Sequence, residues 1–206
     1  MSKIAIISGS IISNFKKKGV IFLNRHQGDK PPHKINHKNN ILSLKKKGVE
    51  TIIGVCSVGS LKKSIKPGSI VIPNDYINFF NIQTFYDNEI KHITPSLDEN
   101  LRKKIIKTAK KAGIKIFNKG VYFQTIGPRL ETKAEINMIK HYADIVGMTM
   151  ANEADLAKEL GVKYAAICSA DNYANGISEE KLNFAEIKKM QKRNKAKIIK
   201  LINNLL

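Results

Sequence analysis

Tryptophan is absent from this chain, and cysteine is scarce. The two cysteines, Cys56 and Cys168, each lie inside an apolar segment, so we expect small core residues rather than a disulfide or a metal pair. No apolar run approaches the roughly 18 residues of a membrane-spanning helix, and the apolar start at Ile4–Ile7 is too short for a signal peptide. We therefore expect a cytoplasmic protein with no membrane segment.

Three enzyme motifs are also missing. The sequence has no Gly-x-x-x-x-Gly-Lys-Ser/Thr loop, which argues against hydrolysis of nucleotide triphosphates. It has no Gly-x-Ser-x-Gly elbow and no His-Glu-x-x-His helix either. These absences remove the P-loop enzymes, the hydrolases built on a serine elbow and the zinc peptidases that use this helix.

Acidic residues number only 17 against 36 lysines and arginines, which gives a formal net charge of +19. Such a balance attracts anions and would suit nucleic acid or phosphorylated partners. The runs Lys16–Lys18 and Lys45–Lys47 lack interleaved aromatic residues, and no zinc-finger, helix-turn-helix or RNA-binding sheet signature accompanies them. We therefore interpret these runs as solvated faces and do not expect nucleic acid as the partner.

What is present indicates an α/β fold. With 206 residues and 42% hydrophobic content, the chain is long enough for one well-buried core, so we expect a single domain over residues 1–206. Short apolar runs alternate with amphipathic segments, which is typical of a central mixed sheet flanked by helices. The predicted strands are Lys3–Ile7, Val20–Leu23, Thr51–Val55, Ile70–Ile72, Val121–Ile126 and Tyr164–Cys168. The predicted helices are Asn39–Lys47, Asp98–Ala112, Thr132–Tyr142, Ala151–Leu160 and, as one or two helices, Glu179–Leu206.

Polar side chains follow the ends of these strands, where ligands bind in open α/β sheets. An arginine offers a planar fork for two oxygens of an anion, a histidine adds a donor, and hydroxyl groups complete a shell without a metal. The small turn Ser8-Gly9-Ser10 can also bring backbone amides to an anion. The strand-end residues are Ser10, Arg25, His26, Ser57, Arg129, Thr149 and Asn172.

A series of short blocks runs in order from the first strand to about Gly176. The blocks include Arg25-His26, Pro32-His33-x-Ile35-Asn36, Val58-Gly59-Ser60-Leu61, Pro67-Gly68-Ser69-Ile70-Val71, Gly127-Pro128-Arg129-Leu130-Glu131-Thr132, Gly147-Met148-Thr149 and Asp171-Asn172-Tyr173. In order and register they resemble the trimeric purine nucleoside phosphorylase and methylthioadenosine phosphorylase family. The resemblance implies a phosphorylase/hydrolase-like fold, phosphorolysis of a purine nucleoside, and no cofactor beyond inorganic phosphate as co-substrate.

The resemblance also implies a site. In this family phosphate attacks the anomeric carbon while the purine leaves from the other face, so the protein positions phosphate and stabilises the departing base. Glu131 and Asn172 are the expected catalytic residues at the base. The implied contacts are Ser10, Arg25, His26, Ser57 and Thr149 to phosphate, Met148 to the ribose, and Leu130, Glu131 and Asn172 to the purine.

The base pocket can be interpreted chemically as well. An ionised Glu131 only accepts hydrogen bonds, which suits the N1–H of a 6-oxopurine and opposes the N1 lone pair of adenine. Asn172 can donate to O6 and accept from a protonated N7. Adenine-specific relatives carry Asp at the positions of Asn172 and Ala174 and lack a Glu at Glu131. We therefore expect inosine, guanosine or 5′-methylthioinosine as substrate, serving purine salvage.

Three features leave alternatives open. Family members place a longer segment between the Ser10 loop and Arg25-His26, so the N-terminal region is shortened here. Leu130 replaces an aromatic residue that many relatives stack on the base, and the 5′ pocket cannot be assigned. The resemblance implies a homotrimer, or a hexamer made of two trimers. The alternatives are a 5′-methylthioadenosine phosphorylase and an inactive paralogue that binds purines or nucleic acid.

Overall fold

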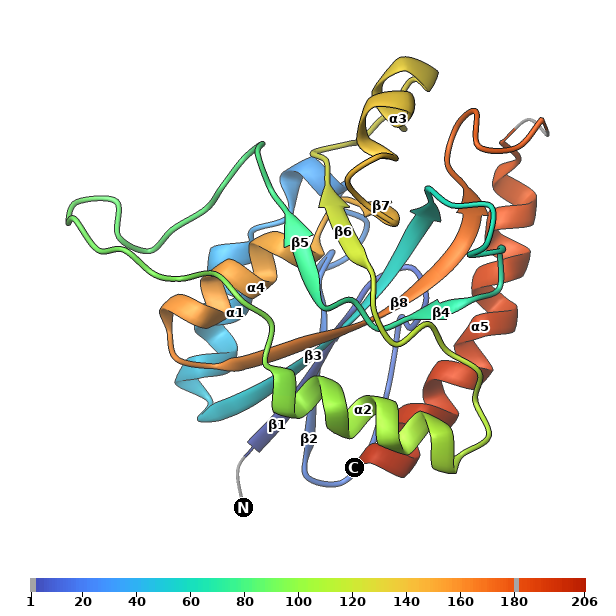
Figure 1. Cartoon of the computed structure of the whole chain (residues 1–206). Coiled ribbons are helices and arrows are strands. Elements are labelled where there is room, and N and C mark those ends of the chain that lie inside the picture. Colours follow the sequence, from blue (N-terminus) through green and yellow to red (C-terminus); the bar gives the residue numbers. More distant parts are fainter. Residues whose placement is uncertain (1–2, 180–181) are drawn as a thin grey trace.

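The computed structural model describes residues 3–179 and 182–206. Its centre is an eight-stranded mixed sheet with helices on both faces, so the predicted fold class is confirmed (Figure 1). The strands are β1 Lys3–Ser8, β2 Val20–Asn24, β3 Val49–Ser60, β4 Ile70–Val71, β5 Asp75–Ile77, β6 Val121–Gln124, β7 Ile145–Gly147 and β8 Lys163–Tyr173. The helices are α1 His37–Lys46, α2 Glu99–Lys111, α3 Lys133–Ile139, α4 Met150–Glu159 and α5 Phe184–Leu205.

Strand β3 is the hub of this sheet. It pairs in parallel with β1 on one side and with β8 on the other. Its last two residues, Gly59 and Ser60, also pair antiparallel with β7. Strands β5, β6 and β7 form a parallel run, while β4 pairs antiparallel with β8. The end of β3 therefore meets β7 and the end of β8 at one place, and the functional cavity lies there.

The two faces of the sheet are covered by different helix pairs. Successive side chains of a strand point to opposite faces. In β3, Ile52 and Cys56 pack in the core that includes residues of α1 and α4, whereas Ile53 and Val55 pack in the core that includes residues of α2 and α5. Because both faces are buried, the strand interiors are continuously apolar rather than alternating.

Local signals explain where several helices begin. The side chain of Asn36 accepts a hydrogen bond from the Asn39 amide at the start of α1, and Asp98 accepts one from the Leu101 amide at the start of α2. Thr132 and Glu135 form a reciprocal capping box at α3. Each contact satisfies an amide that the helix itself leaves unpaired.

The structure differs from the sequence-based expectation in the sheet. Strands β3 and β8 continue past the predicted ends at Val55 and Cys168, because their final residues pair with each other, with one shift of register between Val58 and Gly59. The three-residue strands β5 and β7 were not predicted. The C-terminal stretch forms one helix, α5, and the part of the predicted range at residues 180–181 lies outside the described residues.

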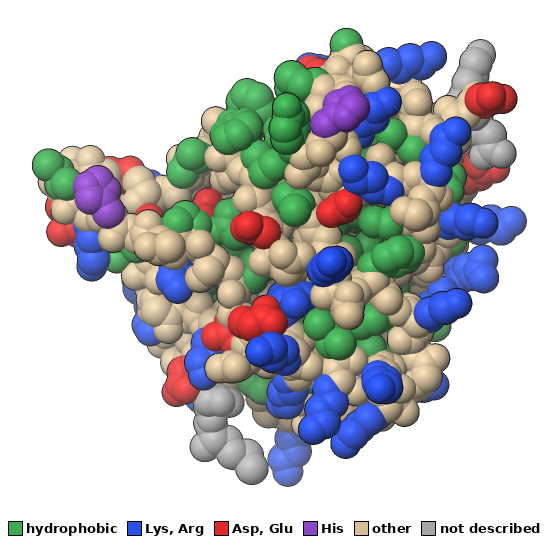
Figure 2. Space-filling view, viewed as in Figure 1, with side chains coloured by type: hydrophobic (Ala, Val, Ile, Leu, Met, Phe, Trp, Pro, Cys, Tyr) green, Lys and Arg blue, Asp and Glu red, His purple; other side chains and the backbone are tan. Residues whose placement is uncertain are grey.

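Two compositional expectations can be compared with the structure directly. Lys45, Lys46 and Lys47 are exposed, and both cysteines are buried and unpaired. Figure 2 shows lysines and arginines spread over the side of the molecule where α2 and α5 lie. Among the described residues, no helix has the length and apolar character that crossing a membrane requires.

Candidate active site

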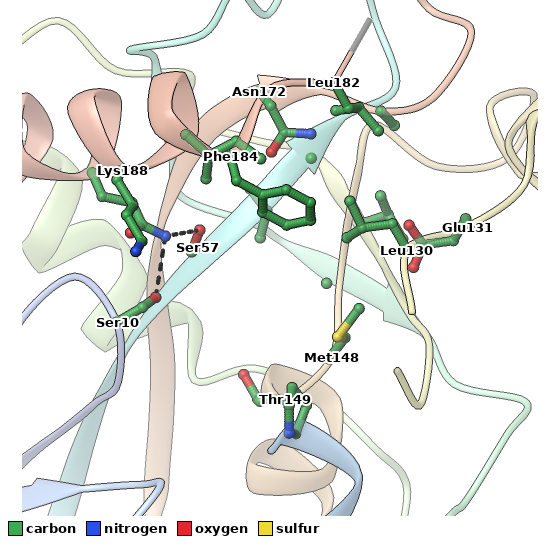
Figure 3. Close-up of a pocket in the computed structure, with 18 of the residues that line it drawn as sticks. Ser10, Ser57, Leu130, Glu131, Met148, Thr149, Asn172, Leu182, Phe184 and Lys188 are labelled. Carbon is green, nitrogen blue, oxygen red and sulfur yellow. Dashed lines mark hydrogen bonds between the residues drawn. The ribbon is translucent and has the colours of Figure 1, made fainter. Parts of the chain in front are cut away.

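Every residue predicted to contact phosphate, ribose or base lines one cavity of about 380 Å³. The cavity lies where β1, β3, β7 and β8 end, with the first turns of α5 along one wall (Figure 3). The predicted residues that line it are Ser10, Arg25, His26, Ser57, Leu130, Glu131, Met148, Thr149 and Asn172. Their individual roles stay predictions. The structure shows only that distant segments of the chain bring them together.

One end of the cavity is rich in hydrogen-bond donors. Thr149 is the N-cap residue of α4, yet its side chain makes no capping bond. Its backbone amide donates to the Tyr122 hydroxyl at 3.1 Å, and its hydroxyl donates to the Cys56 sulfur at 3.8 Å. Sulfur is a weak acceptor, so a ligand oxygen can take its place. His26 is oriented by a 2.7 Å contact between its Nδ1 and the Lys30 carbonyl oxygen. Together with Ser10, these groups suit a tetrahedral oxyanion.

Arg25 departs from the expected two-pronged phosphate contact. Its Nε and Nη2 donate to the two carboxylate oxygens of Glu153 at 2.7 and 3.0 Å, and its Nη1 donates to the Val55 carbonyl at 2.7 Å. The Nε and Nη2 edge of the Arg25 guanidinium is therefore already bonded to the buried Glu153 carboxylate. Arg25 is 3% exposed, and burial, the largest single effect, lowers its pKa. The charge and hydrogen bond of Glu153, together with Cys56 and Tyr164, outweigh burial and hold the pKa well above the ordinary value.

The neighbouring His37 does not add a positive charge to the Arg25–Glu153 ion pair. His37 lies beside the same carboxylate, with its Nδ1 3.9 Å from Glu153 Oε1. Burial lowers the pKa of His37 to about 4, so the imidazole is neutral at neutral pH. Tyr164 adds a hydrogen bond from its hydroxyl to Glu153 Oε2 at 2.8 Å. Arg25 therefore balances the Glu153 charge, and Tyr164 completes its hydrogen bonding.

Gly54 is the residue that makes room for this network. A Cβ added there would lie 2.0 Å from the Tyr164 hydroxyl oxygen and 3.4 Å from Glu153 Oε2. We expect Gly54→Ala to reduce the free energy of unfolding by about 1–3 kcal/mol, the usual cost of overpacking a core. Thermal denaturation measures this loss. In a Tyr164→Phe background, which lacks the clashing oxygen, the added cost of Gly54→Ala is expected to be smaller, and an equal cost would contradict the explanation.

The opposite end of the cavity carries the base-recognition candidates. Glu131 is 8% exposed and accepts a hydrogen bond from the Thr125 hydroxyl at 2.7 Å through Oε1. Asn172 donates one amide hydrogen to the Tyr173 carbonyl at 2.8 Å. Each side chain is thus oriented by one bond, and each retains hydrogen-bonding capacity for a ligand: Oε2 of Glu131, and Oδ1 and the second amide hydrogen of Asn172.

Met148 lies between these two ends, and a glycine makes room for it. A Cβ at Gly127 would lie 2.5 Å from the Met148 sulfur. Gly127 also has a φ of +70°, a conformation that side-chain-bearing residues rarely adopt. The thioether therefore packs directly against backbone at the wall of the cavity.

Helix α5 supplies wall residues that the sequence reasoning did not assign to the site. Phe184, Ile187, Lys188 and Gln191 line the cavity, and Figure 3 shows Phe184 facing Leu130 across it. Their spacing of three and four residues, which places them on one helix face, was the available signal. It was obscured because the helix is rich in lysine and was interpreted only as packing on the sheet.

Arg129 is the one strand-end residue that does not line this cavity. Its side chain is 66% exposed and forms an ion pair with Glu135 at 2.7 Å. Among the residues that the structure describes, no group of three or more His, Cys, Asp or Glu side chains could hold a metal ion.

The fold and this cavity define a class: an α/β protein whose strand ends carry oxyanion donors at one end of a pocket and a buried carboxylate at the other. Residues 4–206 match the family described as the Phosphorylase superfamily, and the chain belongs to that family.

Relatives of this chain have related names. It is 47% identical over 186 residues to the "Probable 6-oxopurine nucleoside phosphorylase" of Archaeoglobus fulgidus, covering 89% of this chain and 76% of the relative. It is 41% identical over 198 residues to the "Probable S-methyl-5′-thioinosine phosphorylase" of Methanocaldococcus jannaschii, covering 93% and 78%. A methylthioadenosine phosphorylase from Schistosoma mansoni in complex with adenine superposes with a TM-score of 0.88 at 22% identity, covering 100% of this chain and 91% of that one. This last similarity shows the shared fold.

Proposed function

We propose that the chain catalyses phosphorolysis of a 6-oxopurine nucleoside, giving the free purine and a ribose 1-phosphate. The observation that carries the proposal is the polarity of one cavity, with hydroxyl and cationic donors at one end and the buried Glu131 carboxylate with Asn172 at the other. Figure 3 shows Ser10, Ser57 and Lys188 on one side of the pocket and Glu131 on the opposite side. The names of the 47% and 41% identical relatives support the same reaction.

The proposed mechanism needs no covalent enzyme intermediate. Ser10, Ser57, Thr149 and His26 hold phosphate below the sugar, and a phosphate oxygen attacks the anomeric carbon as the bond to the purine breaks. Glu131 accepts from N1–H, while Asn172 donates to O6 and accepts from N7. The base gains at N7 the proton that hydrogen phosphate loses on forming the ester, carried through solvent. Positioning the two reactants and stabilising the charge on the leaving group are the main contributions to the rate.

The structure also favours one 5′ substituent. Leu182, Phe184 and Ile187 bring apolar side chains to the cavity wall beside Lys188 and Gln191. A methylthio group buried against them gains the transfer free energy of its carbon and sulfur atoms, whereas a hydroxyl placed there loses hydrogen bonds to water. We therefore propose 5′-methylthioinosine as the preferred substrate, ahead of inosine and guanosine.

Replacing Ile187 with asparagine tests this preference. We expect the ratio of kcat/KM for 5′-methylthioinosine to kcat/KM for inosine to fall by roughly tenfold, the scale of one small apolar group in a pocket. The exposed Lys192 of the same helix offers a control, since Lys192→Asn changes the helix without touching the cavity. A ratio that is equally low in both variants, or unchanged in the Ile187 variant, would contradict the assignment of the 5′ pocket.

The reaction itself is tested by release of free base from inosine, guanosine, 5′-methylthioinosine, adenosine and 5′-methylthioadenosine, each with and without phosphate. Phosphate-dependent release of hypoxanthine or guanine supports the proposal. Preference for the adenine nucleosides would favour a 5′-methylthioadenosine phosphorylase instead. Release from none, combined with salt-sensitive binding to random oligonucleotides, would favour an inactive paralogue.

We also propose a homotrimer, or a hexamer of two trimers, as the assembly. Large apolar side chains are exposed close to the base end of the cavity, and Phe80, Ile126 and Met138 line a second cavity of about 330 Å³ that Glu131 also borders. Figure 2 shows apolar side chains gathered on this part of the surface. Apolar patches of this kind mark interaction surfaces. Sedimentation velocity of the purified chain distinguishes the trimer from a monomer.

The compartment and the wider role follow from the proposed chemistry. Nucleosides and inorganic phosphate meet in the cytoplasm, which we propose as the site of the reaction. The products are a free purine and an activated sugar phosphate, both of which can re-enter synthesis, so we propose a role in purine salvage. Residues 1–206 would act as one phosphorylase domain, with inorganic phosphate as co-substrate and no further cofactor.

A further inference from the structure

A buried carboxyl group lies directly behind the donor-rich end of the cavity. Asp171 of β8 is 2% exposed and does not line the cavity itself. Its Oδ2 accepts a hydrogen bond from the Ser57 hydroxyl at 2.5 Å, and its Oδ1 accepts one from the Ser169 hydroxyl. Ser57 and Ser169 are register partners on the paired strands β3 and β8. Because Ser57 does line the cavity, its hydroxyl group connects Asp171 to the cavity wall.

The direction of the Ser57 hydrogen is fixed by these contacts. A hydroxyl group has one hydrogen to donate and two lone pairs. Ser57 gives its hydrogen to Asp171, and Ser57 Oγ accepts from Gln191 Nε2 at 3.0 Å, a bond drawn as a dashed line in Figure 3. One lone pair then remains for a ligand. At Ser57, the wall of the anion site is therefore a hydrogen-bond acceptor.

The surroundings of Asp171 hold its carboxylate in this role. The Ser169 oxygen accepts from Asn194 Nδ2 at 2.7 Å, so that the Ser169 hydrogen is also directed to Asp171. Burial raises the pKa of Asp171 to about 6, while the donors Ser169, Ser57, Asn194 and Gln191 act to lower it. Asp171 also borders a separate cavity on its other side, and three charged residues of α5 line that cavity: Glu186, Lys189 and Arg193. Lys188 and His26 also line the cavity that contains the anion site.

Tetrahedral anions differ in what they can offer to such an acceptor. Inorganic phosphate still carries a proton at neutral pH, so it can donate a P–O–H hydrogen to Ser57. Sulfate carries none and would place a bare oxygen against a lone pair. We propose that Asp171 is a positioning residue that makes Ser57 a hydrogen-bond acceptor and thereby selects phosphate over sulfate. The inference rests on the proposed function, because it refines the anion site of that reaction.

The proposal fixes the sign of a pH dependence. When Asp171 is protonated, its O–H donates to Ser57, and the Ser57 hydrogen is released toward the cavity, where it can serve any tetrahedral oxyanion. When Asp171 is ionised, Ser57 can only accept a hydrogen bond, so only an anion that carries a proton can bond to it. Selectivity for phosphate over sulfate is therefore low at pH 5 and rises as the pH increases through about 6, the pKa of Asp171.

The test is isothermal titration of the whole chain with phosphate and with sulfate at pH 5 and pH 8. Because phosphate itself changes from a monoanion to a dianion between these pH values, the ratio of sulfate Kd to phosphate Kd is compared with that of Ser57→Ala at each pH. Ser57→Ala removes the acceptor, so the change in its ratio reports only the ionisation of phosphate and of other groups. Relative to this variant, we expect the ratio of the unmodified protein to increase by roughly tenfold from the lower to the higher pH, the value of one hydrogen bond. In Asp171→Asn the side-chain amide donates to Ser57 at every pH, so this relative increase is expected to disappear. The exposed Asp75 gives the matched control, Asp75→Asn, which keeps it.

Each outcome decides the matter. If both anions bind the unmodified protein and its ratio follows that of Ser57→Ala at both pH values, the positioning role of Asp171 is refuted while the phosphate site stands. If phosphate does not bind at either pH, the proposed function and this inference fail together. If Asp171→Asn does not fold, the titrations of the unmodified protein and of Ser57→Ala give the same decision.

Discussion

Glu153→Ala is expected to lower the free energy of unfolding by about 3–5 kcal/mol, because it leaves the Arg25 guanidinium buried without its counter-charge. Glu153 is fully buried and accepts from both Arg25 and Tyr164. A loss of this size is a large part of the stability of an ordinary domain. Chemical denaturation followed by circular dichroism measures it, and Glu50→Ala, at an exposed glutamate, is the control.

The double variant Arg25→Met with Glu153→Leu separates charge from packing. Removing both charges together leaves no unpaired ion, so the double variant is expected to be more stable than Glu153→Ala alone. A double variant as unstable as the single one would show that lost packing, rather than an uncompensated charge, causes the damage.

Glu131→Gln is expected to reduce kcat/KM for the 6-oxopurine nucleoside by roughly ten- to a hundredfold, the value of a hydrogen bond to a charged group. The substitution keeps the size of the side chain and the bond from Thr125, but it replaces a carboxylate that only accepts by an amide that also donates. Steady-state release of free base measures the change. Glu50→Gln, at an exposed site, should leave the rate unaltered.

The nucleoside panel gives this prediction a second readout. Adenine has an acceptor at N1, so Glu131→Gln should lose less activity, or none, with 5′-methylthioadenosine than with 5′-methylthioinosine. Asn172→Asp is expected to shift preference in the same direction, since a carboxylate accepts from the adenine amino group but opposes O6. Equal losses with both nucleosides would mean that Glu131 supports the pocket without recognising the base.

The class of the fold was predictable because burial on both faces of a sheet leaves a strong pattern. Strands such as β1 and β3 contain apolar runs at residues 4–7 and 52–56, and helices such as α2 begin at recognisable capping residues. The ends of β3 and β8 were not predictable in the same way. Their last residues, from Ser57 and Ser169 onward, are small or polar, and they stay extended because each strand supplies the other with hydrogen bonds. Short strands such as β7 depend on neighbours in the same manner.

The candidate site was predictable as a set of residues and less so as a set of contacts. The resemblance to a known family named residues that the structure gathers around one cavity. It could not show that the Arg25 guanidinium forms a bidentate ion pair with Glu153. The two residues lie far apart in sequence and meet only after β3 and α4 pack. It also gave no hint of Asp171 behind Ser57, because that pairing depends on strand register.

The position of β3 at the hub of the sheet has a consequence for how the chain folds. Its two main partners, β1 and β8, come from opposite ends of the sequence, so the contacts that complete the sheet are separated by more than a hundred residues along the chain. Loops of this length must close before the central strand is fully paired, which makes folding slow relative to that of helical proteins of similar size. During synthesis, the edge of β3 that pairs with β8 stays unpaired until residues 163–173 have left the ribosome. Chaperones that shield unpaired strand edges are therefore expected to raise the yield of this protein more than they raise its final stability.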